Sequence, residues 1–421
     1  MQDFLDFLQR EVIPRIAPPL AAAPDQLVYL AGILAGCLPI LAFVLLIALI
    51  WTYGERRIAG FIQHRYGPNR VGPQGILQAV ADGIKLLAKE DVAPDNADRP
   101  LYELAPLMVF TGAFLPFVAL PFSESWVISS MAAGVFYILA FEAIEVIGII
   151  MAGWAPNSKW SLYGGMRLAA QMVAYEIPMS LCILTVVVLA GTLNLGQIVR
   201  LQGGAFGVGN WMVWPWVSPF ATAAFLMFYV GGLAASKRAP FDLPEAESEL
   251  VAGFHTEYSG MRFAFFFLAE YAAMYVVCAV ASICFLGGWH GPGRELLARA
   301  GGDPTVRQLL ADAVRVRDAQ GAWLVWANLW GALSVVGSWV FWKAALYQIV
   351  GAAYLLLKSF SLLFVMVWVR WTFPRIRIDQ VIYMCLKVLL PFSLLCVLGA
   401  AIQTVFFDWS LARWAMSWMG K

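Results

Sequence analysis

Long uninterrupted runs of apolar residues recur along this chain, and they constrain its fold more than any other feature. A helix that crosses a bilayer needs about 20 mainly apolar residues. Runs of that size occur at residues 27–53, 104–122, 127–153, 169–193, 216–236, 263–288, 347–370 and 382–407. We therefore expect an all-α integral membrane protein with about eight transmembrane helices, because helices satisfy their own backbone hydrogen bonds inside lipid.

The composition agrees with a membrane protein and excludes a water-soluble one. Of the 421 residues, 61% are hydrophobic and 13% are charged, whereas soluble domains carry about 25% charged residues. The formal net charge of +1 gives no bulk attraction for nucleic acid. The first apolar run is too long for a signal-peptide core and follows no basic leader, so we expect it to be retained as the first span.

Cysteine and histidine are placed unfavourably for a redox centre. The six cysteines all fall in apolar runs, without a CxxC pair. The three histidines, His64, His255 and His290, lie near the ends of apolar runs, which leaves no mid-membrane pair for a b-type haem. We expect this chain to bind no metal or cofactor of its own, so that any redox chemistry uses a cofactor held by another chain.

The distribution of lysine and arginine predicts the orientation in the membrane. With eight spans, more than half of the basic residues fall in the loops after spans one, three, five and seven. The positive-inside rule assigns those long loops to the cytoplasm and both termini to the other side. If a further apolar stretch, at 322–345, also crossed the membrane, every later loop would lie on the opposite side. We expect this stretch to be interfacial, re-entrant or an outward extension of span seven, which keeps Arg370 to Arg377 cytoplasmic.

We expect one membrane bundle over residues 1–421, since no internal repeat or flexible linker divides the chain. Four segments differ from the rest of that bundle. They are an N-terminal amphipathic segment at 1–26, a cytoplasmic loop with an amphipathic helix at 54–103, an acidic cytoplasmic loop at 237–262 and an extracytoplasmic insertion at 289–346. Within the insertion we expect a helix over residues 305–318 that docks on the outer surface.

The first of these cytoplasmic loops is rich in basic and turn-forming residues. Arg56, Arg57 and Arg65 precede Gly-Pro turns that begin at Gly67 and Gly72. A helix that follows would carry Gln78, Asp82, Lys85 and Lys89 on one face and Ile76, Val80, Ile84 and Leu87 on the other. An anchor in the membrane surface would explain that helix alone. The arginines and turns together predict a rigid, positively charged mouth.

The loop at 237–262 carries five acidic residues within sixteen positions. The start of a helix explains Asp242 and Glu245, which have the capping-box spacing and flank Pro244. It does not explain Glu247 and Glu249, because neighbouring carboxylates raise each other's pKa and favour proton exchange.

Four glutamates fall within the expected spans. Glu142, Glu145, Glu176 and Glu270 would each cost roughly 2.5 to 3.5 kcal/mol at the centre of a membrane helix. Snorkelling from a span end is an alternative, and it is stronger for Glu176 than for Glu142. We expect these groups to face a hydrated interior and to share protons or pair with cations. Lys358, near the middle of span seven, is the candidate counter-charge.

Two classes of membrane protein fit these features. One is a subunit of a redox-driven proton pump that receives an apolar carrier beneath a soluble electron-transfer partner. The other is a self-contained proton-coupled secondary transporter. Transporters usually show an internal repeat, and none is visible in this sequence.

Four longer motifs carry a more specific resemblance. They run from Glu55-Arg56-Arg57 through Gly67-Pro68-Asn69-Arg70 to Glu90, from Gly153-Trp154 through Asn157-Ser158-Lys159 to Tyr175-Glu176, from Arg238-Ala239-Pro240-Phe241-Asp242 to Glu257-Tyr258, and from Pro374-Arg375 to Asp379-Gln380. Over about residues 27–290 and 346–407 the chain resembles the family of H subunits of bacterial NADH:quinone oxidoreductase, respiratory complex I, the counterparts of mitochondrial subunit 1.

The resemblance implies an eight-span subunit of the bacterial cytoplasmic (inner) membrane. Such a subunit forms the quinone-access channel and links reduction of a quinone such as ubiquinone to proton translocation. It implies that iron-sulfur clusters, FMN and NADH reside in partner subunits of the peripheral arm, with small and antiporter-like subunits as membrane partners. Related subunits of membrane-bound hydrogenases use no quinone, but the complete Gly-Pro-Asn and Arg-Ala-Pro-Phe-Asp motifs favour the quinone enzyme.

The resemblance also assigns roles by motif position, none of them catalytic. The residues that would line or support the quinone channel are Arg56, Arg65, Phe241, Arg370 and Arg375. The residues of the implied proton path are Asp242, Glu245, Glu247, Glu249, Glu176 and Glu270. Position 235 often holds glutamate in this family and holds Ala235 here, so we hypothesise that Glu142 and Glu145 substitute for it.

Overall fold

The structure, a computed structural model, describes the chain outside residues 1–24, 204–206, 245–246, 293, 295–338 and 407–421. Throughout this described part the regular elements are helices and no strand occurs. The all-α prediction is therefore confirmed. The N-terminal segment expected at 1–26 lies almost entirely outside the described residues, and so does the helix expected at 305–318.

The apolar runs fold into helices at the expected places. These helices are α4 (Asp25–Ile62), α6 (Arg99–Phe114) with its continuation α7 (Pro116–Ala119), α8 (Gly134–Trp154), α9 (Lys159–Ala190), α11 (Pro219–Ala235), α13 (Gly260–Phe285), α17 (Trp339–Thr372), α18 (Ile378–Tyr383) and α19 (Leu390–Phe406). Among the described residues, seven helical segments are long and apolar enough to cross a membrane. The eighth, α11, has 17 residues, which is the lower end of the spanning range.

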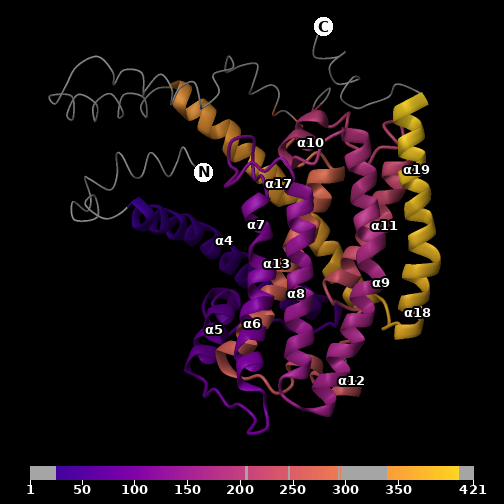
Figure 1. Ribbon diagram of the computed structural model, residues 1–421. Coiled ribbons are helices and arrows are strands. Elements are labelled where there is room, and N and C mark those ends of the chain that lie inside the picture. The colour runs from indigo at the N-terminus through magenta and orange to yellow at the C-terminus, as the bar shows by residue number, and fades with distance from the viewer. Residues whose placement is uncertain (1–24, 204–206, 245–246, 293, 295–338, 407–421) are drawn as a thin grey trace, which may run out of the picture.

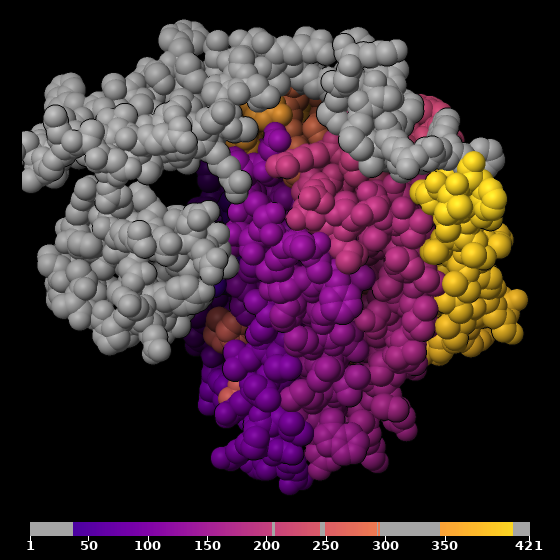
Figure 2. Space-filling view, turned by 45° about the horizontal axis from the view of Figure 1, so that its top comes forward, coloured from indigo at the N-terminus to yellow at the C-terminus, as the bar shows by residue number. Residues whose placement is uncertain are grey.

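The helices form one bundle around α13 (Figure 1). Two thirds of the most apolar stretch of α13 is buried by neighbouring helices, whereas only 28% of the corresponding stretch in Ile378–Phe406 is buried. The last span accordingly forms an edge of the bundle, as its yellow surface shows (Figure 2). A π-helix at Met384–Leu389 joins α18 to α19. Glu270 of α13 is thus surrounded by protein, while α19 presents leucines and phenylalanines outward.

Small residues let α6 and α8 approach each other closely, as is common between membrane helices. A Cβ atom on Gly112 of α6 would lie 2.5 Å from the backbone nitrogen of Glu145 in α8. One turn farther along α8, a Cβ atom on Gly148 would lie 2.8 Å from the backbone nitrogen of Val109. This packing holds the backbone of Glu145 firmly against α6.

The shorter helices lie in the connections between the spans. They are α5 (Gln78–Ala88), α10 (Leu195–Leu201), α12 (Glu247–Leu250) and 3₁₀ turns at Pro73–Gly75 and Gly253–His255. Helix α5 lies within the first long loop, where the sequence predicts an amphipathic helix. Its apolar face is open in the isolated chain, since Val80, Ile84 and Leu87 are 41%, 61% and 66% exposed.

The tryptophan-rich stretch at 322–345 is described only from Trp339 onward. From that residue the chain continues without a break into α17, which therefore starts eight residues before the apolar run predicted for span seven. The described part of the stretch is an extension of that helix, and residues 322–338 lie outside the described part of the chain.

Candidate functional site

A buried ion-pair network joins α4, α13 and α17 to the loop after α11. At its centre is Glu55, which is 5% exposed. One carboxylate oxygen accepts hydrogen bonds from the guanidinium groups of Arg238, at 3.2 Å, and Arg370. The other accepts a hydrogen bond from the hydroxyl of Tyr271 at 2.6 Å. Four segments that are distant in sequence thus meet at one carboxylate.

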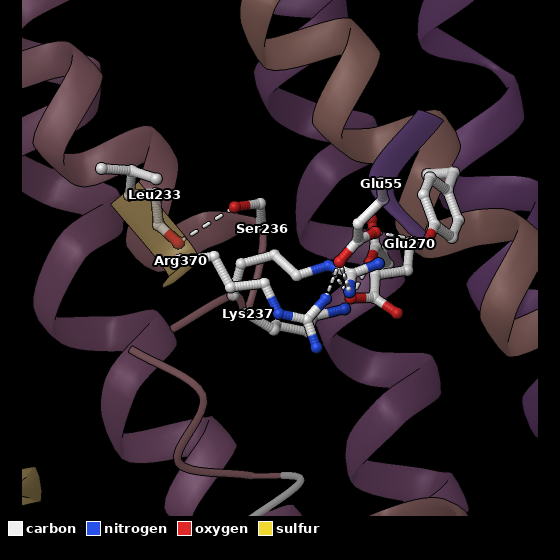
Figure 3. A network of polar contacts seen from close by, with 9 residues as sticks. Glu55, Leu233, Ser236, Lys237, Glu270 and Arg370 are labelled. Atoms are coloured by element: carbon white, nitrogen blue, oxygen red, sulfur yellow. Dashed lines mark hydrogen bonds and ion pairs between the residues drawn. The ribbon is translucent and has the colours of Figure 1, made fainter. Parts of the chain in front are cut away.

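A second carboxylate completes this network. Glu270 of α13 lies 2.6 Å from the Nε atom of Arg238. The guanidinium carbon of Arg238 also lies 4.9 Å from the centre of the Tyr271 ring, a favourable cation–π distance. Figure 3 shows Glu55, Glu270 and Arg370 directed toward one another. Two carboxylates therefore balance two guanidiniums, and such pairing is what keeps buried charge tolerable.

Lys237, next to Arg238 in the chain, forms a separate buried ion pair. Its Nζ atom donates a hydrogen bond of 2.6 Å to Oε1 of Glu145, and the two side chains are only 4% and 5% exposed. The charges that act on Glu142 are those of Glu145, Glu176 and Lys237. The structure therefore brings together three of the membrane glutamates that the sequence singles out, on α8 and α9.

A cavity of about 190 Å³ lies between these two sets of ion pairs. Its charged lining is Lys237, Arg238, Glu270 and Arg370. The rest of its wall is Val109, Ile149, Phe254, His255, Phe263, Phe266 and Phe267. A volume of this size holds several water molecules. The cavity thus combines paired buried charges with an aromatic wall.

The loop after Arg238 places two further predicted residues beside the network. Phe241 is buried, and its carbonyl accepts a hydrogen bond of 3.0 Å from the side chain of Gln171. Asp242 pairs with Arg375 at 3.3 Å. Burial raises the pKa of the Asp242 carboxyl above its usual value, while the guanidiniums of Arg375, Arg370 and Arg238 act in the opposite direction.

The other two predicted channel arginines are exposed, Arg56 near the end of α4 and Arg65 just after that helix. Arg56 pairs with Asp82 at 2.5 Å and thereby ties α5 to the end of α4, with 46% of its side chain exposed. The Nε atom of Arg65 donates a hydrogen bond of 2.5 Å to Gln63. The five predicted channel residues therefore divide into an inner group, Phe241, Arg370 and Arg375, and an outer pair.

The acidic loop is described only in part. Glu249 pairs with Arg167 of α9 at 2.5 Å. That hydrogen bond and the charge of Arg167 lower the pKa of the Glu249 carboxyl. Glu245 and the side chain of Glu247 lie outside the part of the chain that the structure describes.

Lys358 differs from its prediction. Its ammonium donates hydrogen bonds to three backbone carbonyls beyond the end of α13, those of Leu286 at 2.6 Å, Gly288 at 2.9 Å and His290 at 2.5 Å. The prediction of a counter-charge for the membrane carboxylates is wrong for Glu145 and Glu270, because the cations beside them come from the loop after α11.

Sequence reasoning missed the roles of Glu55, Lys237, Arg238 and Tyr271. Glu55 follows the apolar run that ends at residue 53, so it resembles a surface charge, yet α4 continues to Ile62 and keeps it inside the bundle. Lys237 and Arg238 resemble positive-inside anchors for the same reason. A signal was present, since four membrane carboxylates need cations and these two directly follow a span.

No group of three or more His, Cys, Asp or Glu side chains suited to a metal ion occurs among the described residues.

Comparisons with known proteins agree with this architecture. Residues 35–401 match the family described as NADH dehydrogenase. The chain is 43% identical over 371 residues to the H subunit of the NADH-quinone oxidoreductase of Chlorobaculum parvum, a match that covers 87% of this chain and 90% of that protein. It is 42% identical over 355 residues to the protein of the same name from Geobacillus thermodenitrificans, covering 84% and 89%. For Bacteroides thetaiotaomicron the identity is 39% over 367 residues, covering 87% and 89%.

Proposed function

Because the chain belongs to the NADH dehydrogenase family, as a homologue of the H subunit of NADH-quinone oxidoreductase in the membrane part of complex I, we propose that it forms the channel by which quinone reaches its site of reduction. We further propose that its buried carboxylates link that reduction to proton translocation. The single observation that carries this proposal is the cavity of about 190 Å³ with an aromatic wall and a lining of paired charges.

The paired charges supply a way to sense a reaction nearby. Arg370 and Arg238 each pair with the carboxylate of Glu55, and both also line the cavity. A negative charge that develops near them competes with Glu55 and Glu270 for the same guanidiniums. A buried carboxylate that loses its cation has a raised proton affinity and takes up a proton. Reduction of a quinone can thus be converted into a protonation change without a redox group in this chain.

The proposed channel has an inner and an outer part. Phe241, Arg370 and Arg375 lie beside the network and support the inner part, while Arg56 and Arg65 mark the exposed mouth near α5. The open apolar face of α5 suits a position at the membrane surface, where an apolar carrier enters.

The proposed proton path uses the remaining acidic residues. Glu270 lines the cavity, and Glu145, Glu142 and Glu176 continue from it across α8 and α9. Asp242 with Glu245, Glu247 and Glu249 forms the acidic loop on the cytoplasmic side. Ala235 leaves no carboxylate at the end of α11. Lys237, two residues after Ala235, pairs with Glu145 of α8, which supports the hypothesis that α8 supplies the acid instead.

Electron delivery is assigned to partner subunits in this proposal. NADH, FMN and iron-sulfur clusters would be held by the peripheral arm, above the cytoplasmic loops at 54–103 and 237–262. Small and antiporter-like subunits would pack beside the bundle in the membrane. More than half of the lysine and arginine residues fall in the four loops after spans one, three, five and seven, which supports a bacterial inner-membrane orientation with both termini outside the cytoplasm.

The test uses membranes that carry the complete complex with Arg370→Gln or Arg370→Lys. NADH oxidation with quinone, proton translocation and NADH oxidation with an artificial acceptor that bypasses quinone are measured together, after assembly is checked on a native gel. We expect Arg370→Gln to reduce the first two activities at least tenfold and to spare the third, with partial recovery in Arg370→Lys. Exposed Arg377→Gln is the matched control and keeps all three activities.

Unchanged quinone reduction in an assembled Arg370→Gln complex would overturn the channel assignment. Altered uptake of a solute in the same membranes, with quinone reduction intact, would favour a proton-coupled transporter instead.

A further inference from the structure

Lys237 occupies a backbone position at which a helix usually ends with glycine. It follows α11 and the C-cap Ser236, and its φ of 54° lies in the left-handed region. That conformation is strained for an L-residue, which is why glycine is common there. Strain of this kind tends to persist where the side chain has a function that glycine could not supply.

The side chain of Lys237 spans the boundary between the cavity and α8. It lines the cavity together with Arg238, Glu270 and Arg370. Its ammonium contacts Glu145 at 2.6 Å, in surroundings that leave the lysine side chain only 4% exposed. One residue therefore both lines the cavity and pairs with the first carboxylate of the cluster on α8 and α9.

The two partners in this ion pair differ in their freedom to move. The backbone of Glu145 is fixed, because α6 packs against it at Gly112 with room for only a hydrogen atom. Lysine carries a compact charge on a flexible stem of four carbons. Among the ion pairs of the described residues, Glu145 is the one partner of Lys237, whereas Arg238 is held by both Glu55 and Glu270. Movement in this region is therefore easiest for the lysine.

Building on the proposed function, we propose that Lys237 is the positioning residue that transmits charge in the cavity to the carboxylate cluster of Glu142, Glu145 and Glu176. While the cavity holds no extra negative charge, the ammonium stays on Glu145 and keeps it ionised. When negative charge develops in the cavity, the ammonium turns toward it. Glu145 then lies unpaired in an apolar environment and takes one proton from the water of the cavity.

The return of the ammonium completes the step. As Lys237 approaches Glu145 again, the proton leaves for the carboxylate of Glu142 or Glu176, whose charges act on the same cluster. The proton thus enters from water and ends on a neighbouring carboxylate, while the lysine stays protonated throughout. Lys237 positions the charge and Glu145 carries the proton.

The experiment uses the assembled complex with Lys237→Met, Lys237→Arg, Glu145→Gln and the double variant Lys237→Met/Glu145→Gln. Quinone reduction and the number of protons translocated per quinone are measured together, and infrared difference spectra report protonated carboxyl groups on reduction. Lys159→Met is the matched control, because Lys159 is an exposed lysine at the start of α9.

We expect Lys237→Met to lower at least twofold the number of protons translocated per quinone reduced, a ratio that is read independently of the rate of quinone reduction. Glu145→Gln should lower the ratio equally and remove a carboxyl signal from the infrared spectrum. The double variant should be no worse than either single one, since the two residues act as one unit. Lys237→Arg should recover part of the ratio, and the control should match the wild type.

A wild-type proton ratio in assembled Lys237→Met, or losses in the two single variants that add independently, would overturn this proposal. If Lys237→Met does not assemble, the Glu145→Gln variant alone tests the proposal, and a wild-type number of protons per quinone in that variant would overturn it. Either result leaves the channel assignment standing, because that depends on whether Arg370 variants lose quinone reduction.

Discussion

The buried Glu55 of α4 and the half-buried Arg370 of α17 form an ion pair although 315 positions separate them in the chain. The pair joins a helix from the first sixth of the sequence to the penultimate span. Since Arg238 and Tyr271 bind the same carboxylate, the contact connects four segments of the bundle. Its removal should therefore affect stability as well as activity.

Glu55→Gln should be among the most destabilising single substitutions in the chain. It leaves two guanidiniums without the carboxylate they share, and breaking a buried pair from one side costs about 3–5 kcal/mol. Less assembled complex and a lower unfolding temperature of the purified complex are the expected results. Glu103→Gln is the control, because the Glu103 side chain is 67% exposed and lies 3.7 Å from Arg262. Such exposed pairs contribute about 1 kcal/mol at most, so equal effects of the two variants would contradict the prediction.

Gly112→Ala should separate α6 from α8. The added Cβ atom would lie 2.5 Å from the backbone nitrogen of Glu145, and no side-chain rotation relieves a clash with backbone. We expect a loss of roughly 1–3 kcal/mol, as for other overpacked sites, together with a lower proton ratio. Gly83→Ala in α5 is the control, since no atom lies within 4 Å of its added Cβ. It should be neutral or slightly stabilising because alanine favours helix. Thermal unfolding of both variants decides the matter.

Lys358→Met should loosen the connection that follows α13. The substitution removes the donor for the carbonyls of Leu286, Gly288 and His290, and each buried acceptor left unpaired costs about 1–3 kcal/mol. We expect faster proteolysis of this connection in membrane vesicles that expose its side to the added protease. Lys387→Met is the control, because Lys387 contacts the ring of Tyr383 at 4.9 Å on the edge span. The same cleavage rate in both variants would show that the three hydrogen bonds are dispensable.

His290 should make the complex less stable in mild acid. Burial, with the charges of Arg294 and Lys358, lowers the pKa of His290 from 6.5 to about 3. The stability that neutral His290 contributes is complete above pH 6.5 and is lost as the pH falls toward 3, because only the unfolded chain binds the proton in that range. The loss is at most about 1.4 kcal/mol per pH unit.

The unfolding temperature between pH 7.5 and 5.5 tests this point. The unfolding temperature of the His290→Asn variant should fall less steeply as the pH is lowered than that of the wild type. His64→Asn, on an exposed turn, should follow the wild type. A parallel decline of all three proteins would remove His290 as the source of the pH dependence.

Much of the fold follows from the sequence because membrane spans have a simple requirement. Each apolar run became a helix, and the differences are at the ends. The first helix continues to Ile62, beyond the run that ends at residue 53, because its polar residues are satisfied by partners inside the bundle. Local hydrophobicity does not reveal such partners.

The candidate site was predictable in part. The sequence shows that Glu145 and Glu270 need cations, since isolated charge is costly in a membrane. It does not show which cations, because Lys237 is 92 positions from Glu145 and resembles an ordinary anchor at the end of a span. The pairing depends on how α8 and the loop after α11 pack, which is a property of the whole bundle.

The separation between Glu55 and Arg370 also has a consequence for biogenesis. At roughly 5–20 residues per second of synthesis, the 315 intervening residues take on the order of tens of seconds. During that time α4 enters the membrane with a carboxylate whose final counter-charge does not yet exist. Insertion of the first helix must therefore leave Glu55 in contact with water or with the insertion machinery until Arg238 follows, and the ion pairs of this carboxylate are complete only when α17 arrives, so that late steps of translation complete the membrane integration of the first span.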